Sequence, residues 1–245
     1  TVKLGNSSPK ASRFERKWCM ENDSPSEDTR LRFRFLLNPD WLRAGKSQHR
    51  LKDLTLLFVC GFVGSLAAWQ LFAAVSEAAG YTSILESELD LYSPWQQLLL
   101  VVLIAPLLEE VTYRLPLQIN LSLPLVALSC AIGALMVFWP LIIISIICLC
   151  VWSVRPWKQS AENWWRNNPK WPIWIAVTIF GLVHLVNFEV DWTIGAILAA
   201  PFVVSPQLWL GLIFTIGRVR YGWFAGLGLH AAHNLTVWTL STLIS

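Results

Sequence analysis

Long apolar stretches, separated by short polar segments, dominate the chain from residue 54 to its end. A helix of about 20 apolar residues crosses the roughly 30 Å hydrocarbon core of a bilayer. In chain order the stretches predict about seven transmembrane helices, at residues 54–75, 95–117, 121–138, 140–154, 171–188, 192–217 and 222–243. We therefore predict an all-α fold, in which a polytopic transmembrane helix bundle (54–245) follows a polar, basic N-terminal arm (1–53).

The composition agrees with this class of protein. Hydrophobic residues make up 55% of the 245-residue chain and charged residues only 14%, whereas soluble domains carry about 25% charged residues. The 15 tryptophans suit the aromatic belts at the two membrane interfaces. The cysteines are scattered and form no CxxC pair, so they predict neither a disulfide framework nor a thiolate metal site. We expect the arm to be partly disordered with one interfacial helix, and we expect no cleaved signal peptide.

The polar segments differ in charge, and the difference predicts an orientation. Residues 1–53, 155–170 and 218–220 are basic, whereas residues 76–94 and 189–191 are acidic and contain no Lys or Arg. With seven spans and a cytoplasmic N-terminus, every basic segment lies inside and both acidic segments lie outside, as the positive-inside rule requires. We attribute the basic arm to this rule and expect no nucleic-acid partner. The chain is predicted to be integral to a bacterial plasma (inner) membrane or to an internal membrane.

One stretch, Ala105-Pro-Leu-Leu-Glu-Glu-Val-Thr-Tyr-Arg114, places three ionisable residues inside an otherwise apolar span. Each such group costs about 2.5–3.5 kcal/mol on insertion scales, so a functional role is the default interpretation. Glu110 and Arg114 are i,i+4 neighbours on a helix, and we predict that they pair. Glu109 is turned about 100° away and remains free for chemistry.

Two later spans carry Phe180-Gly-Leu-Val-His184 and His230-Ala-Ala-His-Asn234. At about 1.5 Å per helical residue, Glu109, His184, His230 and Asn234 fall in one layer, from the cytoplasmic third of the bilayer to its midplane. His230 and Asn234 share one helix face, whereas His233 is offset and is expected to pack elsewhere. Each group alone could be a structural contact, but their common depth predicts a single site.

This set of side chains suits the activation of water. A desolvated carboxylate can act as a general base, a histidine can share the water proton, and a second histidine with an asparagine amide can stabilise an oxyanion. Two histidines and a carboxylate also form a zinc-hydrolase pattern, with Glu109, His184 and His230 as the ligands if a metal binds. We expect no obligatory metal, because Asn234 is placed for hydrogen-bond donation and is a poor zinc ligand. The sequence contains no H-E-x-x-H, no Gly-x-Ser-x-Gly and no paired Asp within the spans.

The three motifs together resemble those of a known family. Glu109-Glu110-x-x-x-Arg114, Phe180-x-x-x-His184 and His230-x-x-x-Asn234, in that order on three spans, are similar to motifs of the CPBP family. These are the CAAX prenyl endopeptidase type II and bacteriocin-processing membrane proteins, also called the Abi family. The resemblance covers about residues 95–238.

The resemblance implies a glutamate-dependent intramembrane endopeptidase that cleaves a peptide bond near the cytoplasmic face. By this resemblance Glu109 activates water with His184, while His230 and Asn234 form the oxyanion hole. Glu110 and Arg114 support the site. The implied partners are the lipid bilayer and a peptide or protein substrate, either prenylated or a leader peptide.

Two other functions remain open from the sequence. A catalytically silent family member would act as an immunity or scaffold protein that binds a membrane partner. The intact Glu109, His184, His230 and Asn234 favour the enzyme, because a silent member would be free to lose them. A proton-coupled transporter would use the same groups as a relay, but the sequence shows no inverted repeat that would support it.

Overall fold

The computed structural model describes residues 50–114, 117, 123–136, 141–168 and 170–244. All of them belong to one unit of the chain, Pro39–Ser245. The predicted N-terminal arm lies outside the described residues except for residues 50–53, which form the first turn of a helix. The junction between the predicted spans 121–138 and 140–154 lies outside them as well. The predicted boundary at residue 53 therefore stays a prediction.

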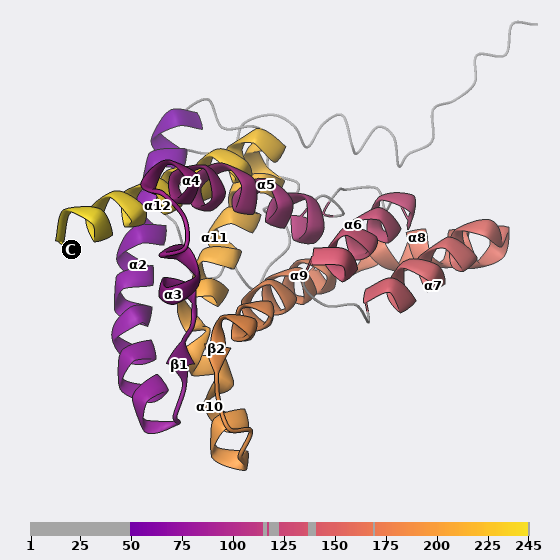
Figure 1. The fold of residues 1–245 in the computed structure, drawn as a ribbon. Coiled ribbons are helices and arrows are strands. Elements are labelled where there is room, and N and C mark those ends of the chain that lie inside the picture. Colours follow the sequence, from indigo (N-terminus) through magenta and orange to yellow (C-terminus); the bar gives the residue numbers. More distant parts are fainter. Residues whose placement is uncertain (1–49, 115–116, 118–122, 137–140, 169, 245) are drawn as a thin grey trace, which may run out of the picture. The chain divides into compact units, whose positions relative to one another are not determined.

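The described residues are mostly helical (Figure 1). The first half contains α2 (Arg50–Ala78), β1 (Thr82–Ser83), α3 (Leu85–Leu89), α4 (Pro94–Leu98), the π-helix η3 (Leu99–Ile104), α5 (Ala105–Glu109), the π-helix η4 (Glu110–Arg114) and α6 (Leu123–Met136). The second half contains α7 (Leu141–Ser153), α8 (Arg155–Asn167), α9 (Lys170–Val183), the 3₁₀-helix η5 (His184–Asn187), β2 (Phe188–Glu189), α10 (Ile194–Val203), α11 (Ser205–Tyr221) and α12 (Trp223–Ile244).

Several of these helices are long and apolar enough to cross a membrane. Four continuous stretches meet this condition, Arg50–Ala78, Pro94–Arg114, Lys170–Asn187 and Ile194–Tyr221. A fifth would arise if the bent pair Ile142–Ser153 and Arg155–Trp165, which turns by 112°, formed one span. The described residues are thus mostly helical, and several of the helices are consistent with a membrane protein.

The predicted count of about seven spans is not confirmed. Helices α6 and α7 contain 14 and 13 residues, so each is only about 20 Å long and shorter than the roughly 30 Å hydrocarbon core. Helix α12, with 22 residues, has the length of a span but carries His230, His233 and Asn234. The finer count therefore stays a prediction.

Residues 155–167 of the basic segment, which the sequence predicts as a polar loop between two spans, form helix α8 instead. Its residues are amphipathic at a helical period, with Trp157, Ala161 and Trp164 on one face and Arg155 and Glu162 on the other. Pro156 stands in the first turn, where a missing backbone N–H costs nothing. The prediction of a loop was wrong, because it rested on the charge of the segment and not on its helical periodicity.

Helix α11 packs against α2, α9 and α12, and all seven residues from Gly211 to Gly217 are buried. Helix α10 ends at Val203 and α11 begins at Ser205, so the predicted span 192–217 is interrupted between Pro201 and Pro206. At the other end, Gly222 has φ +96° and joins α11 to α12. Glycine tolerates this left-handed value, and the turn brings α12 back along α11.

The two acidic segments meet in a short antiparallel ladder. Strand β1 pairs with β2, and Thr82 lies opposite Glu189. Beside the ladder, the hydroxyl of the buried Tyr81 donates a hydrogen bond to the Ala196 carbonyl at 2.8 Å. The two segments that the charge pattern predicts on one side of the membrane are therefore neighbours.

Candidate functional site

Glu109 and Glu110 lie where the hydrogen-bonding pattern of the helix changes from α to π. The chain passes from the π-helix η3 through α5 to the π-helix η4, and the change from α5 to η4 falls between Glu109 and Glu110. Short π-helical segments within α-helices occur frequently at functional sites. The wider turn alters the directions of the two side chains, so their environments differ strongly. Glu110 is wholly buried, whereas the Glu109 side chain is 25% exposed.

Glu110 and Arg114 form the predicted ion pair. Arg114 Nη1 donates to Glu110 Oε1 at 2.6 Å, and both side chains are buried. The guanidinium also lies over the Phe180 ring at 4.2 Å and over the Phe214 ring at 5.4 Å. Arg114 Nε donates to the Thr215 hydroxyl at 3.3 Å. A buried charge needs such compensation, because removal from water costs several kcal/mol per ion, of order 5.

Glu109 faces two histidines from two other helices. Its Oε1 lies 4.0 Å from His184 Nε2, at the junction of α9 and η5. Its Oε2 lies 3.4 Å from His230 Nε2 on α12. The structure thus brings together three of the four predicted site residues, although they are separated by up to 121 positions in the chain, from 109 to 230.

The environment of His184 determines its tautomer. His184 Nδ1 lies 2.7 Å from the Phe180 carbonyl oxygen. A carbonyl can only accept a hydrogen bond, so Nδ1 carries a proton and Nε2 of the neutral ring presents a lone pair. This lone pair faces Glu109, which is also an acceptor. Two acceptors 4.0 Å apart therefore face each other across a gap that no direct hydrogen bond closes.

His230 stands between the two glutamates. Its Nδ1 lies 3.4 Å from Glu110 Oε1 and its Nε2 lies 3.4 Å from Glu109 Oε2. The ring stacks on Phe214 with centroids 4.4 Å apart. A neutral imidazole carries one N–H and can donate to only one carboxylate at a time. His230 therefore links the partly exposed Glu109 to the buried ion pair, a connection that the sequence motifs did not predict.

Several buried polar atoms of this cluster lack a hydrogen-bond partner among the described residues. They are Glu109 Oε2, Glu110 Oε2, Arg114 Nη2 and His230 Nδ1. Buried polar atoms are nearly always hydrogen-bonded, and exceptions call for a functional explanation. Four such atoms in one cluster suit a site that binds a polar group.

Asn234 lies one turn after His230 but has a different partner. Its amide Nδ2 donates to the Val101 carbonyl in η3 at 2.9 Å. His233 is separate from the two carboxylates and makes ring contacts with Phe62 and Phe214, each with centroids 6.1 Å apart. The expected packing role of His233 agrees with these contacts.

The donor positions at this site can hold only part of a metal coordination shell. Zinc binds His nitrogen and carboxylate oxygen at about 2.0–2.2 Å in a tetrahedral arrangement. The 3.4 Å separation of His230 Nε2 and Glu109 Oε2 suits two ligands of one ion, but the 4.0 Å separation of His184 and Glu109 is too wide. Among the described residues, no group of three or more His, Cys, Asp and Glu side chains converges to hold a metal. The three expected ligands do not fit a metal in this arrangement.

Several residues that surround the buried ion pair were not identified from the sequence. Phe214 and Thr215 come from α11 and complete the surroundings of Arg114. Gly226 of α12 leaves room for Glu110, because a Cβ at that position would lie 3.2 Å from Glu110 Oε2. Gly226 lies four residues before His230, so helical spacing could have placed it on the same face.

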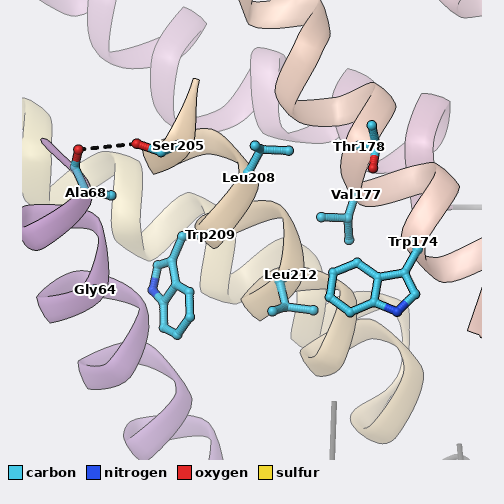
Figure 2. Close-up of a pocket in the computed structure, with 9 residues that line it drawn as sticks. All are labelled: Gly64, Ala68, Trp174, Val177, Thr178, Ser205, Leu208, Trp209 and Leu212. Atoms are coloured by element: carbon cyan, nitrogen blue, oxygen red, sulfur yellow. Dashed lines mark hydrogen bonds between the residues drawn. The ribbon is translucent and has the colours of Figure 1, made fainter. Parts of the chain in front are cut away.

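One cavity of the described residues has neither glutamate in its lining (Figure 2). It is an open groove of about 580 Å³ between α2, α9 and α11, lined mainly by apolar side chains that include Trp174 and Trp209. Ser205 lines the groove and donates a hydrogen bond to the Ala68 carbonyl at 3.3 Å. The groove lacks the ionisable groups that hydrolysis requires, so the polar cluster is the stronger candidate site.

Comparisons of the chain with family models, with curated proteins and with solved structures found no match. The family resemblance therefore rests on the three motifs and stays a prediction.

Proposed function

We propose that the chain is an intramembrane endopeptidase of the CPBP type, in which Glu109 and His184 activate water. The observation that carries the proposal is the pair of facing acceptors, Glu109 Oε1 and His184 Nε2, 4.0 Å apart. A water molecule between them would donate one hydrogen bond to each, which leaves an oxygen lone pair for attack. Both side chains are partly exposed, at 25% and 17%, so the position between them is not fully enclosed by the described residues.

In the proposed reaction the water oxygen attacks the carbonyl carbon of a peptide bond, and Glu109 takes the water proton. The new C–O bond produces a tetrahedral oxyanion. Its collapse breaks the C–N bond, and the amine leaves with the proton that Glu109 returns. Desolvation among apolar side chains strengthens the carboxylate as a base, and general acid–base catalysis of this kind contributes about 10²–10⁴-fold.

The remaining polar residues support this step. His230 is proposed to donate to the oxyanion together with Asn234, whose amide nitrogen carries a second hydrogen besides the one given to Val101. Glu110 Oε1 lies 3.4 Å from Nδ1 of His230, the ring nitrogen opposite the one that faces Glu109. Arg114 neutralises Glu110. No step of the reaction is routed through a metal.

The proposed absence of an obligatory metal has its own test. Metal analysis of the purified active protein should find substoichiometric zinc, and turnover should survive chelators. Stoichiometric zinc, with turnover lost on chelation and restored by zinc alone, would overturn this part of the proposal.

The proposed orientation has about seven spans with the N-terminus in the cytoplasm. The pairing of β1 with β2 supports it, because both acidic segments then lie on one side. Single cysteines introduced at Gln159 and at Ser87 should be labelled by impermeant reagents from the cytoplasm and from outside, respectively. Labelling of position 159 from outside intact cells would contradict the orientation.

The enzymatic proposal is tested by cleavage of a CAAX-type peptide and a bacteriocin-leader peptide in detergent micelles. Glu109→Gln keeps shape but removes the base, so turnover should fall at least about 10²-fold. Glu162→Gln replaces a partly exposed acid of α8, which packs mainly against α7, and should cleave like the wild type. Equal cleavage by Glu109→Gln and the wild type would refute the mechanism. If the wild type cleaved neither peptide but bound a membrane partner, a silent binding protein would replace the enzyme as the better interpretation.

A further inference from the structure

The hydrogen bond from Asn234 to Val101 connects the two helices that carry the site. Val101 belongs to η3, which leads through α5 to the glutamate pair. Asn234 belongs to α12, one turn after His230. The bond is 2.9 Å long and joins residues 133 positions apart. It therefore fixes α12 against the segment that presents Glu109.

Pro106 explains why the Val101 carbonyl needs a partner from another helix. In a π-helix the carbonyl of residue i accepts from the N–H of residue i+5. The Ala105 N–H follows this pattern and donates to the Leu100 carbonyl. By the same spacing the Val101 carbonyl would accept from residue 106, but proline has no N–H. A carbonyl left unpaired in an apolar setting is destabilising, and the Asn234 amide supplies the missing hydrogen bond.

We propose that Asn234 is a positioning residue, whose bond to the carbonyl left free by Pro106 holds Glu109 in place against His230. His230 and Asn234 lie on one face of α12, four residues apart. One of them contacts the Glu109 carboxylate and the other holds the backbone that leads to it. The bond thus sets the register between the imidazole and the carboxylate. This role is distinct from donation to the oxyanion, which would use the second amide hydrogen.

Substitution of Pro106 can separate the two roles of Asn234, the bond to Val101 and donation to the oxyanion. Asn234→Ala removes both the Val101 bond and any donor to the oxyanion. Adding Pro106→Ala restores a backbone N–H that can serve Val101, but it adds no donor at the reacting carbonyl. Pro201→Ala is the matched control, because it also restores an N–H inside an apolar helix, α10, which is remote from the site.

The first measurement is thermal melting in detergent, which does not depend on the proposed function. Asn234→Ala should melt at a lower temperature than the wild type. Pro106→Ala in the Asn234→Ala background should recover most of the lost melting temperature. Pro201→Ala in the same background should shift the melting temperature no more than it does in the wild type. If Pro106→Ala prevents folding, Pro106→Ser restores the same N–H and takes its place. Equal melting shifts from Pro106→Ala in the wild type and in Asn234→Ala would overturn the proposal.

The second measurement is turnover, and this arm alone rests on the proposed endopeptidase. A displacement of about 1 Å at a reacting group costs up to about 10²-fold, so Asn234→Ala should lower kcat by about 10²-fold with KM little changed. Adding Pro106→Ala to Asn234→Ala should raise kcat again by at least about tenfold. Recovery of melting without recovery of kcat would overturn the positioning role. If the wild type cleaves no peptide, the proposed function fails while the melting cycle still tests the bond.

Discussion

Two ion pairs with the same i,i+4 spacing occur in different parts of the molecule. In the Glu110–Arg114 pair the charged atoms are 2.6 Å apart, and the side chains are 0% and 1% exposed. In the Lys158–Glu162 pair on α8 the charged atoms are 4.0 Å apart, and the side chains are 41% and 27% exposed. The first pair is enclosed by residues of α9, α11 and α12, whereas the second has neighbours mainly on α7.

The comparison shows that spacing along a helix predicts contact but not energy. Loss of one partner of a buried pair typically costs about 3–5 kcal/mol, because the other charge remains without water or counter-ion. An exposed i,i+4 pair contributes only about 0.3–0.5 kcal/mol. The surroundings, not the spacing, account for this tenfold difference.

The largest effect is expected from breaking the buried pair. Glu110→Gln leaves the Arg114 guanidinium buried between Phe180 and Phe214 without its counter-ion. We expect a loss of about 3–5 kcal/mol in the free energy of unfolding, with Arg114→Gln similar. Thermal or chemical unfolding in detergent measures this loss. A Glu110→Gln protein as stable as the wild type and inactive, beside a Glu109→Gln protein that still cleaves, would reverse our assignment of the two acids.

The double substitution sharpens the comparison. Glu110→Gln/Arg114→Gln removes both charges, so no buried ion is left without a partner. Its loss of stability should be smaller than the sum of the two single losses, because the pair is one interaction. A double-mutant cycle on unfolding free energies measures the coupling. Additive losses would show that the two side chains act independently despite their 2.6 Å contact.

A smaller effect is expected from Gly226→Ala on α12. The added Cβ would lie 3.1 Å from Arg218 Cβ, 3.2 Å from Glu110 Oε2 and 3.2 Å from the Phe214 carbonyl. Such overpacking costs about 1–3 kcal/mol. Gly228→Ala is the matched control, because a Cβ there meets no atom within 4 Å. The control should melt at or above the wild-type temperature, since alanine favours a helix over glycine by about 1 kcal/mol; equal melting of the two variants would contradict the close approach.

The smallest effect is expected at the exposed pair. Lys158→Gln should lower the free energy of unfolding by about 0.5 kcal/mol or less, and added salt should remove the difference. Melting curves of this variant and the wild type at low and high salt measure it. A loss as large as that of Glu110→Gln would show that α8 is enclosed by a partner, and the two pairs would no longer differ in kind.

The sequence by itself determined the class of protein and the local parts of the site. The apolar stretches predicted helices that the structure contains, and the i,i+4 spacing of Glu110 and Arg114 predicted their contact. Both depend on neighbours within one helix, which the chain order specifies directly. The separation of Glu109 from that pair followed from the same geometry. Segment 155–170 shows the limit of charge as a guide, because its amphipathic period outweighed its basic character.

Only the tertiary structure decided which groups from different helices meet. His184 and His230 were both candidates for Glu109, but the structure places His230 between Glu109 and Glu110 and turns the His184 lone pair toward Glu109. Asn234 was expected on the same helix face as His230, and the structure shows that its amide donates to the Val101 carbonyl of another helix. These contacts depend on the crossing of helices and on the π-helical turns, and those depend on close packing at residues such as Gly226. The hydrophobic periodicity of a sequence indicates which face of a helix is buried, but it does not indicate which other helix packs against that face.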